Sequence, residues 1–189
     1  MTLSALGIFS AAGAGGGVSL SDFELISTTL FAGSTSQVDF DVSSLASTYK
    51  HLQLRVVGRT ARAAGTDSVG LRFNSDSGSN YNGHYLLGDG GSVTSGSFSN
   101  TYVASDILGN SVDNSNFVAP AIIDLLDVFS NSKNKTIRTF EGVHATPKWV
   151  GILSNLWRNT NTVTTIRVFV ASGSNFTSNT RVSLYGIKG

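Results

Sequence analysis

The chain has 189 residues, which suits a single domain, and a domain of this size buries about 70% of the surface of its unfolded chain. Charged residues make up only 13% of it, and 13 Lys and Arg against 12 Asp and Glu give a net charge of +1. Because no run of basic residues occurs, the sequence argues against a surface for nucleic acid or anionic membranes. The lack of Cys excludes disulfides, thiolate metal sites and cysteine nucleophiles.

The sequence of residues 1–21 predicts an N-terminal docking arm with a Gly-rich hinge at residues 13–17. The large apolar side chains near its start are Leu3, Leu6, Ile8 and Phe9. A segment this short cannot bury them locally. The first basic residue is Lys50, so the positive region of a signal peptide is missing, and the apolar stretch is too short to span a membrane. We therefore expect these side chains to dock on a partner protein.

Residues 22–189 mostly alternate apolar and polar side chains, which predicts antiparallel strands with one face on a core. The apolar positions of the clearest segments are Val38, Phe40 and Val42; Leu52, Leu54 and Val56; Val69, Leu71 and Phe73; Ile166, Val168 and Val170; and Val182 and Leu184. Turn-forming clusters lie at 32–36, 63–67, 89–92, 130–134 and 172–175. Many short strands at this spacing indicate a single sandwich or barrel domain.

One segment fits two structures. Apolar residues recur at every fourth position, at Phe117, Ala121, Leu125 and Phe129. That spacing would form the apolar stripe of a helix. Pro120 and the β-branched pair Ile122 and Ile123 oppose a helix, so we expect a strand over residues 121–128.

No motif in the sequence indicates an enzyme or a metal site. His51, His84 and His144 are scattered without metal-ligand spacing, and neither G-x-S-x-G nor G-x-G-x-x-G occurs. The oxygen-rich segment Asn74–Asn80 holds one carboxylate and no bidentate Glu, which favours an Asx turn over a calcium loop. We expect no catalytic residue, metal or cofactor.

Two carboxylate pairs are candidates for glycoside hydrolysis, which needs a carboxyl group on each side of the cleaved bond. Alternation places Asp39 and Asp41 together on the solvent-facing side of one strand, which is an ordinary position for carboxylates. Asp124 and Asp127 would face opposite sides of a strand. Neither pair gives a positive argument for hydrolysis.

Four aromatic residues are candidates for stacking against a sugar or for contacts with another subunit: Tyr81, Tyr85, Trp149 and Trp157. Each lies near Asn, Gly or His residues, and an aromatic ring offers an apolar face with polar groups close by. Large aromatic side chains are also commonly buried in cores and interfaces, and that alternative stays open.

Several segments resemble a family of virion proteins of marine and cyanobacterial tailed phages. They are Ser47–Arg55 (STYKHLQLR), Leu71–Tyr81 (LRFNSDSGSNY), Ile123–Asp127 (IDLLD), Lys135–Arg138 (KTIR), Leu156–Asn161 (LWRNTN) and the terminal Leu184–Gly189 (LYGIKG). The segment Leu3–Gly13 is similar to the leader of some members. The resemblance covers residues 23–189 and includes no catalytic residue.

The resemblance implies a structural component of a virion, associated with the tail, neck or fibre and assembled in the host cytoplasm. With the sequence pattern, it leads us to expect an all-β antiparallel sandwich, jelly-roll-like, behind the N-terminal arm. We expect other virion proteins as partners and a homo-oligomer, with a trimer favoured. Alternatives are a capsid decoration protein and a module that binds a host surface glycan; a depolymerase ranks last. We expect no nucleic acid and no membrane insertion.

Overall fold

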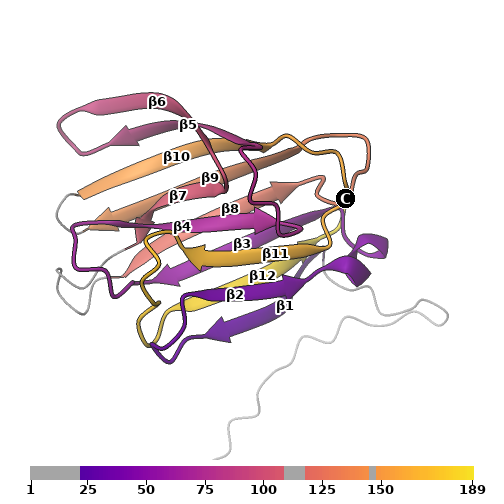
Figure 1. Ribbon diagram of the computed structural model, residues 1–189, viewed down its shortest axis with the longest axis horizontal. Helices are drawn as coiled ribbons and strands as arrows, with labels where there is room; N and C mark the ends of the chain where they lie inside the picture. The colour runs from indigo at the N-terminus through magenta and orange to yellow at the C-terminus, as the bar shows by residue number, and fades with distance from the viewer. Residues whose placement is uncertain (1–21, 109–117, 145–147) are drawn as a thin grey trace, which may run out of the picture.

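The computed structural model describes residues 22–108, 118–144 and 148–189, and these form two antiparallel β-sheets that pack face to face (Figure 1). The larger sheet contains, in spatial order, β1 (Phe23–Leu30), β12 (Arg181–Ile187), β3 (His51–Gly58), β8 (Ala119–Leu126), β9 (Lys135–His144), β10 (Lys148–Trp157), β5 (Tyr81–Gly88) and β6 (Val93–Asn100). The smaller sheet contains β2 (Gln37–Asp41), β11 (Thr165–Val170), β4 (Asp67–Phe73) and β7 (Val103–Leu108). A short 3₁₀ helix, η1 (Ser43–Ser47), follows β2.

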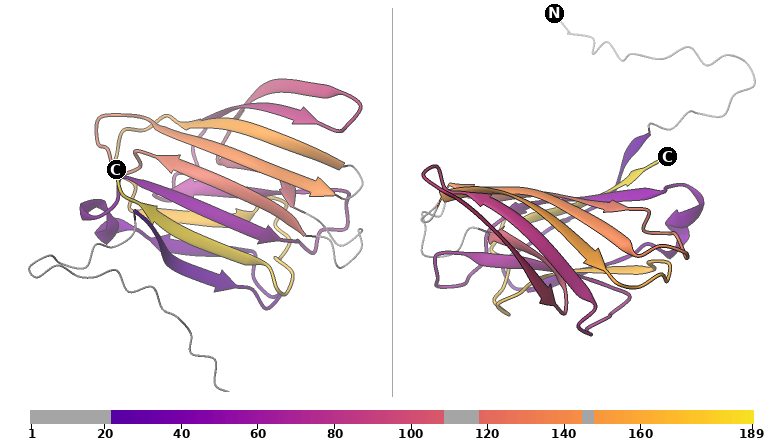
Figure 2. Two further views of the ribbon diagram at one scale, coloured as in Figure 1. Left: turned by 180° about the vertical axis from the view of Figure 1, so that it is seen from behind. Right: turned by 90° about the horizontal axis from the view of Figure 1, so that it is seen from above.

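The strand order is that of a jelly roll, in which two four-stranded sheets exchange strands through Greek-key connections. One sheet is β1-β12-β3-β8 and the other is β2-β11-β4-β7. Two further hairpins, β5–β6 and β9–β10, extend the first sheet beyond β8 (Figure 2). The prediction of an antiparallel, jelly-roll-like sandwich is confirmed, while the predicted arm at 1–21 lies outside the described residues.

The core lies between the sheets, where the alternating apolar residues meet. Leu54, Ile123 and Leu184 of the larger sheet face Leu71 and Val168 of the smaller one, and all are fully or almost fully buried. The strand expected over 121–128 is confirmed as β8, although it runs over Ala119–Leu126 and therefore includes Pro120. The predicted turn clusters fall between strands, except that Asp67 already begins β4.

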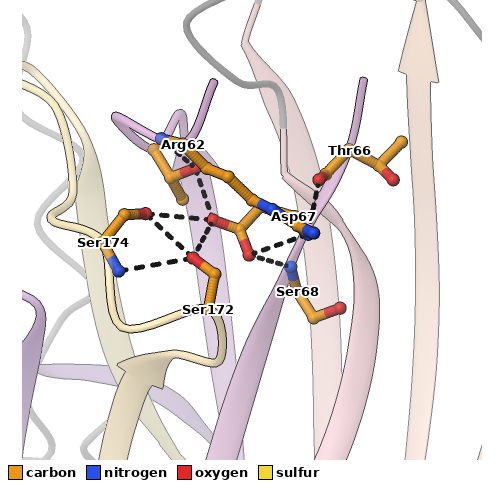
Figure 3. A network of polar contacts seen from close by, with 7 residues as sticks. Arg62, Thr66, Asp67, Ser68, Ser172 and Ser174 are labelled. Atoms are coloured by element: carbon orange, nitrogen blue, oxygen red, sulfur yellow. Dashed lines mark hydrogen bonds and ion pairs between the residues drawn. The ribbon is translucent and has the colours of Figure 1, made fainter. Parts of the chain in front are cut away.

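A buried carboxylate holds together the loops at one end of the sandwich (Figure 3). Asp67 is only 2% exposed. Its Oδ2 atom accepts hydrogen bonds from Thr60 Oγ1 (2.7 Å), Ser172 Oγ (2.8 Å) and Ser174 Oγ (3.2 Å). Its Oδ1 atom accepts one from the Ser68 amide and lies 3.8 Å from the Arg62 guanidinium. The loop after β3 and the loop after β11 are thus joined at the start of β4.

A buried ammonium group plays the corresponding role at another set of loops. The Lys135 side chain is fully buried, and its Nζ atom donates to the carbonyl oxygens of Ser130 (2.7 Å), Lys133 (2.7 Å) and Thr160 (3.1 Å). Burial lowers the pKa of Lys135 from its ordinary value. Because these carbonyls belong to the β8–β9 and β10–β11 connections, the lysine links two chain reversals.

Candidate functional site

The four aromatic residues named as candidate ligand or interface contacts lie in two different environments, two in the core and two at the surface. Trp157 and Tyr81 are fully buried, with ring centroids 6.3 Å apart, and Trp157 also packs against Phe73 at 5.3 Å. Burial raises the pKa of Tyr81 to about 12. These two rings belong to the core and present no surface to a glycan. Their interpretation as ligand contacts is wrong, because β5 and β10 place both residues on the face that the smaller sheet covers.

The Asp76 loop completes this part of the core. Asp76 Oδ1 accepts a hydrogen bond from the Gly78 amide at 2.8 Å, which confirms the predicted Asx turn. Its Oδ2 atom accepts from Trp157 Nε1 (2.7 Å) and Asn80 Nδ2 (2.9 Å). Burial alone would raise the pKa of Asp76, but these hydrogen bonds outweigh it and hold the pKa below its ordinary value. Both oxygens of the Asp76 carboxylate therefore accept hydrogen bonds from other groups of the protein.

Tyr85 and Trp149, in contrast, line one hollow. We call it the aromatic hollow: its walls are Tyr85, Leu87 and Asp89 from β5 and its turn, Ser92 and Thr94 from the turn and β6, and Trp149 from β10. Its volume is about 280 Å³. It lies on the inner face of the sheet extension, meaning the face turned toward the smaller sheet, where both rings are only half-buried.

Glycines on the neighbouring strands allow the rings at the hollow to lie flat. Tyr85 pairs across the strands with Gly96, and a Cβ atom at Gly96 would come within 2.6 Å of the Tyr85 hydroxyl. Phe98 lies over its own partner Gly83 in the same way. The Tyr85 and Phe98 rings are 6.5 Å apart at 26°. An aromatic ring over a cross-strand glycine is a device that fixes the register of the strand pair.

Besides the hydroxyls of Tyr85, Ser92 and Thr94, the residues that line the hollow carry the Asp89 carboxylate and the Trp149 indole N–H. Asp89 Oδ1 accepts hydrogen bonds from the amides of Gly91 (2.8 Å) and Ser92 (2.7 Å), and these bonds hold the pKa of Asp89 below its ordinary value. Asp89 is therefore ionised at neutral pH. The Trp149 Nε1 atom is buried and finds no hydrogen-bond partner in the described part of the chain. The arrangement offers two ring faces and a carboxylate, which suits a neutral polyhydroxylated ligand.

A second surface lies on the outer face of the larger sheet. Ile122 of β8, Phe140 of β9, Ile152 of β10 and Leu86 of β5 are cross-strand neighbours, and we call them the outer apolar row. Their exposed fractions are 38%, 55%, 58% and 51%. A shallow apolar depression of about 180 Å³ lies beside it, lined by Pro120, Ile122, Phe140, Glu141, Gly142 and Val150. The outer face of an antiparallel sheet is usually polar, so this row is an unusual feature.

Each carboxylate of the two pairs considered in the sequence contacts other side chains of the protein. Asp39 accepts two hydrogen bonds from Arg167, at 2.7 and 2.9 Å, and Asp41 Oδ1 accepts from the amide and the hydroxyl of Ser43. Asp124 accepts from Gln53, whereas Asp127 lies past the end of β8 and pairs with Lys133 at 2.9 Å. Among the residues that the structure describes, no group of three or more His, Asp or Glu is placed to hold a metal ion.

Glu141 is a buried acid that sequence reasoning missed. It points into the sandwich from β9, is 2% exposed and accepts a hydrogen bond from Ser105 of β7. The contact joins the two sheets.

No helix in the described ranges is long and apolar enough to cross a membrane.

Comparisons with protein-family models, with curated proteins and with solved structures find no match.

Proposed function

We propose that this chain is a non-enzymatic structural component of a tailed-phage virion, located in the tail, neck or fibre apparatus. One observation supports the assembly role: the outer apolar row crosses four adjacent strands and remains exposed in the single chain. Contiguous exposed apolar side chains mark surfaces that pack against another protein. The assignment to a phage particle comes from the resemblance of the segments named above.

The energetics favour burial of this row in an assembly. Fully burying one large apolar side chain contributes about 1.5–3 kcal/mol, and the side chains of the row are already partly buried. Four half-exposed side chains together still provide several kcal/mol for association, before the entropy cost of assembly. Charged residues border the row on one side: Arg55 of β3 lies opposite Ile122, and Asp124 of β8 pairs with Arg138 of β9.

The arm supplies a second proposed contact. Leu3, Leu6, Ile8 and Phe9 would dock on another virion protein, while the outer apolar row packs against a copy of the chain or a neighbour. A trimer remains the favoured homo-oligomer, because cyclic symmetry closes such contacts. A capsid decoration protein would use the same surfaces at a higher copy number.

Substituting the outer apolar row tests the assembly role. The double variant Phe140→Ser/Ile152→Ser is expected to keep its thermal unfolding midpoint within a few degrees, because both side chains are more than half exposed. Its incorporation into particles should fall by about tenfold or more, since about 1.4 kcal/mol already changes an equilibrium tenfold. The measurement is the amount of variant in purified particles when it complements a phage that lacks the gene.

The matched control is Leu25→Ser/Leu30→Ser on β1, whose side chains are 58% and 65% exposed at the far edge of the same sheet. This variant is expected to incorporate normally. Equal incorporation of both double variants would contradict a role for the outer apolar row.

A second candidate function is the binding of a host surface glycan in the aromatic hollow. The specific observation in its favour is that Tyr85 and Trp149, which are far apart in the sequence, line one hollow with the Asp89 carboxylate. A pyranose has apolar C–H faces that stack on aromatic rings and hydroxyls that donate to a carboxylate.

Replacing Trp149 by alanine tests this candidate. Affinity for a polysaccharide extracted from the host surface should fall by about tenfold or more, because one of two stacking rings is lost. Tyr185→Ala removes an outer-face ring that stacks on Phe23, and this control should bind as the wild type does. Calorimetry on the three proteins decides the matter: wild-type affinity in the Trp149→Ala protein would exclude the hollow as the glycan site.

A further inference from the structure

The two sheets end in four edge strands, and three of them carry features that oppose pairing with another copy. β1 contains Glu24 and has a register shift between Leu25 and Ser27. β2 contains Asp39 and Asp41, and the pairing of β7 with β4 has a register shift between Asp67 and Val69. A charged residue or an irregularity on an edge strand is the usual protection against edge-to-edge association. In the described part of the chain, only the β6 edge lacks such protection.

The β6 strand is regular and carries no charged side chain, and its edge away from β5 has no other strand beside it in the described part of the chain. It pairs with β5 at eight successive positions, from Val93 with Gly88 to Asn100 with Tyr81, without a register shift. Its sequence, VTSGSFSN, contains no charged residue and no proline. The backbone N–H and C=O groups that point away from β5 therefore form a row that meets no strand among the described residues.

The side chains of β6 can form hydrogen bonds with the same side chains of a second copy of the protein. The outward-facing residues Ser95, Ser97 and Ser99 are exposed hydroxyls, and a hydroxyl both donates and accepts a hydrogen bond. In antiparallel pairing about a two-fold axis, each side chain near the axis faces its own copy or a close neighbour of it. A charge would then face a like charge, whereas serine hydroxyls can bond to one another across the strands.

We infer that β6 pairs antiparallel with β6 of a second copy of this chain, so that the two larger sheets form one continuous sheet across a two-fold axis. The occupant is a second copy rather than an unrelated strand, because all the polar side chains of β6 carry both donors and acceptors and none carries a charge. The contact goes beyond the proposed function and is independent of where the protein resides. A two-fold contact between two trimers would give six copies.

A charge at the centre of β6 tests this contact with the full-length chain. Ser97→Lys and Ser97→Glu each place a charge in the middle of β6, close to the like charge of the second copy, and each is expected to halve the mass of the wild-type assembly in solution. Mixing the two variants should restore the wild-type mass, because lysine then faces glutamate. Leu30→Lys on the β1 edge is the matched control and should leave the mass unchanged. Light scattering coupled to gel filtration measures the masses.

Cysteine cross-linking gives a second, independent readout, because the natural chain contains no Cys. Single variants Ser95→Cys, Ser97→Cys and Ser99→Cys should differ: the position nearest the two-fold axis forms a disulfide-linked dimer on mild oxidation, and the others form less. A wild-type chain that stays a single copy, an unchanged mass in Ser97→Lys, or no cross-link at any of the three positions would overturn the inference. None of these results depends on whether the protein is found in particles.

Discussion

Replacing Trp157 by alanine is expected to lower the free energy of unfolding by about 3–5 kcal/mol, which is the usual loss when a large aromatic residue in a core is replaced by alanine. Trp157 is fully buried, packs against Phe73 and Tyr81, and donates from Nε1 to Asp76 at 2.7 Å. The substitution therefore creates a cavity and leaves a partly buried carboxylate without one of its donors. Urea denaturation followed by circular dichroism measures the change.

Two further variants make this result specific. Trp157→Phe keeps most of the packing but removes the hydrogen bond to Asp76, and it should lower the free energy of unfolding by about 1.5–3 kcal/mol. Trp149→Ala, on the same strand, should lower it less than Trp157→Ala does, because Trp149 is only half-buried and packs against the small cluster of Ala119 and Val143. Equal losses for Trp157→Ala and Trp149→Ala would contradict the assignment of Trp157 to the core.

Replacing Asp67 by alanine is expected to lower the free energy of unfolding by about 3 kcal/mol or more. The change leaves the buried hydroxyl of Thr60 and the loop hydroxyls of Ser172 and Ser174 without their shared acceptor, and it removes the carboxylate beside the half-exposed Arg62 guanidinium. Each buried polar group left unpaired costs about 1–3 kcal/mol, and some of these groups can turn to water or to one another. Chemical denaturation of the variant and the wild type measures the difference.

The control for Asp67 lies on the neighbouring pair of strands. Asp39 is bonded to Arg167 in a surface ion pair whose side chains are 50% and 39% exposed. Because surface pairs contribute about 0–1 kcal/mol, Asp39→Ala should change the stability little. A loss at Asp67 no greater than the loss at Asp39 would show that the buried network does not hold the two loops together.

The alternation of the sequence predicted those strands whose inner residues are apolar and whose outer residues are polar. β3 is one of these, with Leu52, Leu54 and Val56 buried and Arg55 exposed. β9 could not be predicted in this way, because Phe140 points outward while the acid Glu141 points into the sandwich. β6 could not be predicted either, since serine and glycine occupy half of its positions and its apolar residues do not alternate.

The candidate sites could not be predicted from the positions of the strands alone, because they also depend on which strands pair. Trp149 and Trp157 lie on the same face of β10, and only their places along the strand decide that one enters the core and the other lines a hollow. The outer apolar row likewise consists of four residues from four strands, and none is a neighbour of another in sequence. Alternation assigns faces, but it does not determine which strands become neighbours.

The proposal of a structural virion component is tested most directly by the copy number and location of the protein in purified particles. Quantitative mass spectrometry measures the number of copies, and antibody labelling in electron micrographs shows where they lie. We expect a small number of copies, in multiples of three or six, at the tail or neck. Hundreds of copies spread over the head would identify a decoration protein instead. Complete absence of the protein from purified particles would contradict the proposal.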